Sequence, residues 1–240
     1  MAVACVVAFS SAALADWEPG DDYKMHFPQL PDPEGWDVSF ELGTVVLADD
    51  WLCTESGTVD DIHLWTSWQG DDEGVTEAMV ATIWSNNPQG PDGYSIPDQL
   101  LWAGLLDPDD WTYRFYDVGL QGWYDPVSGQ FDPEDHNLIF QYNILGIDDP
   151  FEQVAGEIYW LGIQPFSAGF LGWKTSLDQF EDDAVWYDEV TERWYELRDP
   201  RTGESLDLAF VITTETIIPE PAGIGLLGLL GLVAVRRRRR

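Results

Sequence analysis

The sequence predicts an all-β protein that folds as a single β-sandwich of the Ig-like or jelly-roll kind. The 240 residues include 13 Trp, and 45% are hydrophobic and 14% aromatic, which is enough for one well-filled core. Aromatic and β-branched residues favour strands. Apolar residues alternate over short runs separated by Gly, Pro and Asp, and no run keeps the period of an amphipathic helix.

The expected strands follow one another at short intervals along the chain. The first two, residues 36–41 and 44–48, are expected to pair through a turn at Leu42 and Gly43. Residues 59–68 alternate with Trp on both faces, which predicts a central strand of a sheet. The remaining strands are expected over residues 75–84, 99–105, 111–118, 138–145, 157–166, 180–187, 193–197 and 205–213.

Turn chemistry supports these strand limits. Asp125, Pro126 and Gly129 occur in the order of a hairpin loop built on a type I turn, and the same order recurs within residues 199–204. Residues 16–35 are rich in Pro, Gly and Asp and predict an extended lead-in to the sandwich domain.

Several large side chains are expected in the core. Trp65, Trp84 and Trp160 lie in predicted strands with apolar neighbours. Cys53 is expected to be buried as a small hydrophobe. The second cysteine, Cys5, lies in an N-terminal segment that we expect to be removed, so no disulfide within the chain is predicted.

Charge restricts the possible partners. All but one of the 44 acidic residues lie within residues 16–218, whereas five of the 11 basic residues end the chain. The intervening region is therefore strongly acidic, which excludes nucleic acid and anionic membrane surfaces as partners of this region. Cations and neutral sugars remain.

The N-terminus has the pattern of a secretory signal peptide over residues 1–15. Residues 2–9 form an apolar run, and Ala13 and Ala15 fit the rule for small residues at the cleavage site, with cleavage before Asp16. The rest of the chain is therefore expected to be exported.

The C-terminus has the pattern of a short membrane anchor. After a linker at residues 214–218 and a polar turn, residues 222–235 carry no charge and as a helix would reach about 21 Å, against a hydrocarbon core of about 30 Å. The chain then ends in a basic cluster that is expected to stay on the cytoplasmic side. This cluster consists of Arg236, Arg237, Arg238, Arg239 and Arg240.

Pro219, Glu220 and Pro221 precede the apolar helix, and the two prolines hold this segment extended. The triplet, the Gly-rich apolar helix and the Arg cluster, residues 219–240, resemble the PEP-CTERM sorting signal of bacterial exosortase substrates. The resemblance implies processing near the triplet by an exosortase-type enzyme. It also implies a final location in the cell envelope or outside it, often with exopolysaccharide.

The region between the signal peptide and the sorting signal also resembles a known domain. The phrases at residues 27–33, 35–38, 47–51 and 182–186 resemble an uncharacterised domain of secreted proteins from planctomycete-type bacteria. The resemblance covers most of residues 24–213, which include the sandwich domain expected at residues 36–213. It implies no activity.

No motif for catalysis is present. The sequence lacks Gly-x-Ser-x-Gly, His-Glu-x-x-His and Cys-x-x-Cys, and His26, His63 and His136 have no spacing typical of a catalytic or zinc site. His63 is expected to be a strand-surface or satisfied core residue. A carboxylate pair for glycoside hydrolysis would arise by chance among so many acids, so a polysaccharide hydrolase is the third hypothesis.

Repeated Asp-Asp pairs suggest calcium as a possible ligand, because calcium prefers hard oxygen ligands from loops. The candidate ligands are Asp49 and Asp50 before Trp51, and Asp182 and Asp183, each pair expected where a loop meets a strand. The simpler interpretation is an acidic surface that salt screens without any specific site.

The expected function is that of an exported, non-enzymatic protein of the cell envelope or its matrix, with a structural or adhesive role. The alternative is a carbohydrate-binding module in which exposed Trp or Tyr stack on sugar rings. The two differ in an observable way, because most of the Trp side chains would fill the core in the first case.

Overall fold

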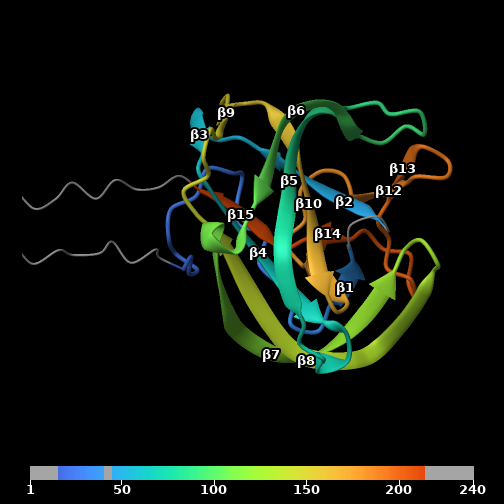
Figure 1. Ribbon diagram of the computed structural model, residues 1–240. Coiled ribbons are helices and arrows are strands. Elements are labelled where there is room, and N and C mark those ends of the chain that lie inside the picture. The colour runs from blue at the N-terminus through green and yellow to red at the C-terminus, as the bar shows by residue number, and fades with distance from the viewer. Residues whose placement is uncertain (1–15, 41–44, 214–240) are drawn as a thin grey trace, which may run out of the picture.

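The computed structural model describes residues 16–40 and 45–213, and the fold of these residues is all-β (Figure 1). Their regular elements are strands except for two single 3₁₀ turns, η1 (Gln69–Asp71) and η2 (Pro108–Asp110). No helix in the described residues is long and apolar enough to cross a membrane. The signal peptide, the linker and the sorting signal predicted from the sequence lie outside the described residues.

The larger sheet has seven strands and partly closes on itself. Its order is β14 (Asp207–Leu208), β11 (Leu171–Ser176), β1 (Trp36–Ser39), β7 (Trp111–Asp125), β8 (Gln130–Ile144), β4 (Asp61–Trp68) and β15 (Phe210–Thr213). All neighbours are antiparallel except β1 and β7. Because β11 also pairs with β4, strands β4, β8, β7, β1 and β11 form a closed circuit, which we call the five-strand ring.

The second sheet has six antiparallel strands. Its order is β13 (Arg193–Glu196), β12 (Val185–Asp188), β2 (Val46–Leu52), β10 (Ile158–Ala168), β5 (Val75–Asn87) and β6 (Ile96–Leu106). A small ribbon joins β3 (Gly57–Val59) to β9 (Phe151–Gln153). In Figure 1 the long β7–β8 hairpin curves along the lower side of the molecule, below β5 and β10.

One large hydrophobic core lies between these sheets. Its largest fully buried side chains include Trp51, Trp65, Trp68, Trp173 and Phe210. Burial of such aromatic groups is the main term that favours this arrangement. The all-β class is confirmed and agrees with a sandwich or barrel-like fold, while the Ig-like or jelly-roll topology stays a prediction.

Several local predictions are confirmed. Strand β4 is central, with β8 on one side and β15 and β11 on the other. The β7–β8 hairpin has the expected turn, in which Gly129 has a φ of 70° and donates its N–H to the Asp125 carbonyl at 2.9 Å. Trp65, Trp160 and Cys53 are buried.

Other predictions are wrong. The two strands expected to form the first pair, β1 and β2, lie in different sheets, because β1 pairs with β7 and β11 while β2 pairs with β10 and β12. The segment expected at residues 180–187 is a strand only from Val185. Trp84 is half-buried, because it lies on the outer face of the six-stranded sheet against Trp194.

The lead-in, residues 16–35, is packed onto the domain. Trp17 and Met25 are buried in the core. Met25 forms a β-bridge with Cys53, and Gln29 forms one with Phe210. Extended backbone was expected here, and the bridges explain how it is held.

Candidate functional site

The two acidic pairs proposed as calcium ligands lie in one region of the fold, and only Asp182 and Asp183 are in the expected setting, where a loop meets a strand. Asp49 and Asp50 lie in the middle of β2, so the prediction that they sit where a loop meets a strand is wrong. Successive side chains in a strand point to opposite faces, which separates these two carboxylates. Asp182 and Asp183 precede β12, the neighbour of β2.

Asp49 points between the sheets and is fully buried. Its Oδ2 accepts hydrogen bonds from Gln29 Nε2 at 2.9 Å and from the Leu208 amide at 2.6 Å, and its Oδ1 accepts from the Asp50 amide at 2.8 Å. Burial, followed by the charges of Asp207 and Asp50, raises the pKa of Asp49 well above its usual range. With its acceptors used in this way, Asp49 ties β2 to β14.

Asp50 points to the opposite face, where its register partner is Trp160. The side chain is buried, and neither carboxylate oxygen has a hydrogen-bond partner among the described residues. Burial raises the pKa of Asp50 well above its usual range, and the nearby charges of Asp207, Asp182 and Glu181 raise it further. Asp50 therefore favours its protonated form.

Asp207 of β14 joins the two pairs into one acidic cluster. Its Oδ2 accepts the Phe180 amide at 2.7 Å. Burial raises the pKa of Asp207 to about 7, and the charges of Asp183 and Asp182 contribute. Asp183 has a compensating partner, because Arg198 Nε lies 2.6 Å from its Oδ2. We use "acidic cluster" for Asp49, Asp50, Asp182, Asp183 and Asp207.

The acidic cluster does not have the arrangement of a metal site. Within residues 16–40 and 45–213, no group of three or more His, Cys, Asp or Glu side chains is placed to hold a metal ion. Calcium takes six to eight oxygen ligands, whereas Asp49 is committed to amide donors and Asp183 to Arg198. Calcium binding stays a prediction, and the geometry favours protonation as the chemistry of this cluster.

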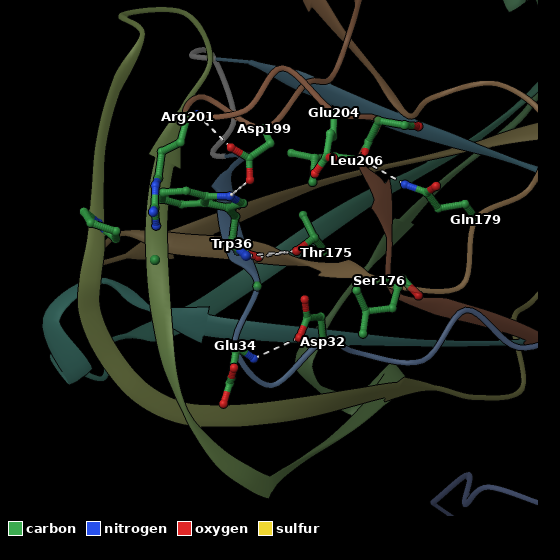
Figure 2. Close-up of a pocket in the computed structure, with 15 residues that line it drawn as sticks. Asp32, Glu34, Trp36, Thr175, Ser176, Gln179, Asp199, Arg201, Glu204 and Leu206 are labelled. Atoms are coloured by element: carbon green, nitrogen blue, oxygen red, sulfur yellow. Dashed lines mark hydrogen bonds between the residues drawn. The ribbon is translucent and has the colours of Figure 1, made fainter.

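A separate open pocket of about 590 Å³ lies beside β1 and β11 (Figure 2). Asp32 and Glu34 line it from the segment before β1, Trp36 from the start of β1, and Asp199 and Glu204 from the second predicted turn. Gly203 in that turn has a φ of 75°, as its sequence pattern requires. The turn thus carries polar groups to the rim of a concave surface.

Asp199 organises this pocket, and in Figure 2 it lies between Arg201 and Trp36. Its Oδ2 accepts the Trp36 indole N–H at 2.8 Å, and its Oδ1 accepts the amides of Arg201 at 2.7 Å and Thr202 at 2.9 Å. Burial acts to raise the pKa of Asp199, but these hydrogen bonds outweigh it and lower the pKa. Asp199 is therefore a charged acceptor at the pocket wall.

The tryptophan side chains pack inside the protein rather than on its surface. All 13 lie in the described residues, eight are buried, and none of the other five is exposed. Even Trp36 at the pocket is only 6% exposed. A row of exposed Trp for sugar stacking is therefore not part of the described surface.

The three histidines have different environments. His63 is a satisfied core residue, with Nδ1 2.7 Å from Asn143 Oδ1 and Nε2 3.0 Å from Thr213 Oγ1, and burial lowers its pKa to about 4. His26 is stacked on Phe180, and burial lowers its pKa to about 4 as well. His136 belongs to a buried polar network.

This network was missed in the sequence, because its members are far apart in the chain. Asp37 Oδ2 lies 3.0 Å from Lys174 Nζ and 2.9 Å from His136 Nε2, and His136 Nδ1 lies 2.9 Å from Asp135 Oδ2. The side chains of Asp37, Lys174 and His136 are all 0% exposed. The one available signal was Lys174, a rare lysine in an acidic chain, flanked by Trp173 and Thr175.

Together, the fold and these sites define an acidic, two-sheet all-β domain with an open polar pocket and a buried Asp–Lys–His network. The chain belongs to the family described as Domain of unknown function (DUF7901), whose profile matches residues 25–213. Comparisons with curated proteins and with solved structures gave no match. The expectation of an uncharacterised domain over most of residues 24–213 is thus confirmed at the level of the family.

Proposed function

We propose that the protein is an exported, non-enzymatic component of the cell envelope or its extracellular matrix, with a structural or adhesive role. The observation that carries this proposal is the use of the tryptophans: among the described residues all 13 are buried or half-buried. A domain that uses its tryptophans for internal packing is stabilised as a rigid body, and the aromatic side chains that it does expose are Tyr and Phe, such as Tyr23, Phe115 and Phe170. The strongly acidic composition favours solubility and disfavours polyanionic partners.

The C-terminal residues 219–240 support the second half of the proposal, which is export to the cell envelope. Their resemblance to a PEP-CTERM signal, together with the signal-peptide pattern of residues 1–15, suggests that an exosortase-type enzyme releases the domain from the inner membrane. The bacterial source suggested by the sequence phrases is of the planctomycete type, and exopolysaccharide is the expected surrounding. In this scheme Pro219, Glu220 and Pro221 mark the processing point.

Fractionation of cells that express the full chain tests this proposal. Mass spectrometry of the envelope form is expected to find residues 16–218 without the terminal Arg cluster. Replacement of all five residues 236–240 with Gln should reduce retention at the inner membrane before processing, because clustered positive charge holds the tail on the cytoplasmic side. Recovery of mature envelope protein that still carries Arg236–Arg240 would contradict the proposal.

The open pocket supports a second candidate, a carbohydrate-binding module. Its lining combines one indole edge with several carboxylates and the Gln179 amide, groups that bond sugar hydroxyls. Affinity electrophoresis in neutral polysaccharides is the test. Retardation that is lost in Gln179→Ala but kept in the control Gln99→Ala, an exposed residue of β6, would favour the module. No retardation by any polysaccharide would remove it.

A further inference from the structure

Asp37 and Lys174 lie opposite each other on neighbouring strands. They are register partners in the antiparallel β1–β11 pair, and Trp123 of β7 is the register partner of Asp37 on its other side. Lys174 Nζ lies 3.0 Å from Asp37 Oδ2. Because the carboxyl carbon Cγ is bonded to Oδ2, the amine also lies close to the carbon of the acid.

The five-strand ring keeps water away from this pair. Asp37 and Lys174 are 0% exposed and Trp123 is 6% exposed. Gly172 permits the close packing, because a Cβ at this position would lie 2.7 Å from Asp37 Cβ and 2.8 Å from the Trp123 ring. Such a site holds two reactive groups in one orientation and in a low dielectric.

The charges in this site are poorly compensated. Asp37 Oδ1 has no hydrogen-bond partner among the described residues, and the lysine has only Asp37 Oδ2 and the Gly35 carbonyl as acceptors. Two buried charges cost desolvation that their attraction repays only when the remaining polar atoms are satisfied. Burial lowers the pKa of Lys174, although the charge and hydrogen bond of Asp37 oppose this, so the neutral amine is accessible.

A proton donor, His136, contacts the same oxygen of Asp37. His136 Nε2 lies 2.9 Å from Asp37 Oδ2, and Asp135 holds the other ring nitrogen at 2.9 Å. Burial alone would lower the pKa of His136, but the hydrogen bond and charge of Asp37 and the hydrogen bond of Asp135 raise it. The imidazole can therefore donate a proton to Oδ2.

We propose that Lys174 and Asp37 condense into an isopeptide bond between Nζ and Cγ, which makes this pair a self-modification site. The ammonium first passes one proton to the carboxylate. The neutral amine then attacks Cγ, a second amine proton passes to Oδ2, which Nζ contacts at 3.0 Å and His136 Nε2 at 2.9 Å, and the Cγ–Oδ2 bond breaks with release of water. The lysine ammonium and the aspartate carboxylate thus become one neutral amide and one water, so that atoms and charge balance without an oxidant or co-reactant.

The product removes the most unfavourable feature of the site, its two buried charges. One amide replaces two buried charges, and Oδ1 remains as its carbonyl oxygen. Gly35, whose carbonyl accepts from Lys174, also lines the open pocket, so the released water has a short way to solvent. The bond would join positions 137 residues apart and hold β1 to β11 covalently. This inference does not depend on the proposed function, because it concerns a bond within the domain and not its destination.

Peptide mapping by mass spectrometry of the folded, purified full chain tests the inference. We expect one cross-linked peptide pair that contains Asp37 and Lys174 and is lighter than the sum of its parts by one water. The chain has two lysines, so reductive methylation after denaturation should modify Lys24 but not Lys174. Detection of the linear peptide with a methylated Lys174 in the folded wild-type protein would overturn the inference.

Variants separate the chemistry from the fold. Lys174→Met should abolish the mass deficit, whereas the control Lys24→Gln should keep it. His136→Gln should slow bond formation in newly synthesised chains by about 10²-fold, since it removes the proton donor to Oδ2. A mass deficit that persists in Lys174→Met would also refute the assignment, and the wild-type peptide map decides the question even if a variant does not fold.

Discussion

The buried Asp207 carboxyl should make stability depend on pH in a way that one substitution can remove. Burial raises the pKa of this group from 3.8 to about 7. Since the folded-state pKa is the higher one, the fold favours the protonated acid. The stability that depends on this proton is fully present at a pH below the unfolded-state pKa. It is lost as the pH rises through the folded-state pKa.

Asp207→Asn keeps an acceptor for the Phe180 amide and cannot ionise. At about 1.36 kcal/mol per pKa unit, the substitution should raise the free energy of unfolding by about 4 kcal/mol at pH 8, and by less than about 2 kcal/mol at pH 5. His26 and His63, whose pKa values are lowered to about 4, also change stability over acidic pH, but equally in both proteins.

Urea denaturation of wild type and variant at pH 8 and pH 5 measures this difference. The matched control is Asp148→Asn, which removes one charge from an exposed position. It corrects for the general repulsion of a highly acidic chain. The reasoning fails if Asp207→Asn is no more stabilising than the control at pH 8, or if its effect is the same at both pH values.

Three further outcomes are expected. Trp65→Ala and Trp160→Ala should each lower the free energy of unfolding by about 3–5 kcal/mol in chemical denaturation. Trp84→Ala should lower it by less, because Trp84 is half-buried. A loss below about 1 kcal/mol at Trp65 would contradict its burial. Sodium chloride should raise the melting temperature, because it screens repulsion over about 8–10 Å, and a fall would contradict this account. Calcium should give no larger shift than magnesium at equal ionic strength, whereas a saturating calcium shift that disappears in Asp49→Ala and Asp182→Ala would establish a site.

The sequence was a good guide to local structure and a poor guide to pairing. Alternation and turn chemistry predicted β4, β5 and the β7–β8 hairpin, because these depend on neighbours in the chain. Strand β11 was not predicted, since Gly172 and Lys174 interrupt its apolar pattern. The pairing of β1 with β7 and β11 has no local signal at all, because it is decided by contacts between distant segments.

The same limit applies to the sites. The candidate ligands Asp49, Asp50, Asp182 and Asp183 were chosen from local pairs, and they do lie in one region because β12 pairs with β2. The burial of these side chains, and the presence of Asp207 beside them in the acidic cluster, depend on tertiary contacts. Asp37 lies 99 residues from His136 and 137 residues from Lys174 in the chain, so only the folded chain brings it to them.

The position of β1 within its sheet has a consequence for when the protein can fold during its synthesis. Both neighbours of β1 are made much later than β1 itself, and β4 also waits for β15 near the end of the domain. Pairing between distant segments is slow, because loop closure must precede any gain from contacts. During synthesis the first strands therefore remain without partners, and we expect the chain to leave the ribosome largely unfolded and to acquire its structure only once residue 213 has emerged.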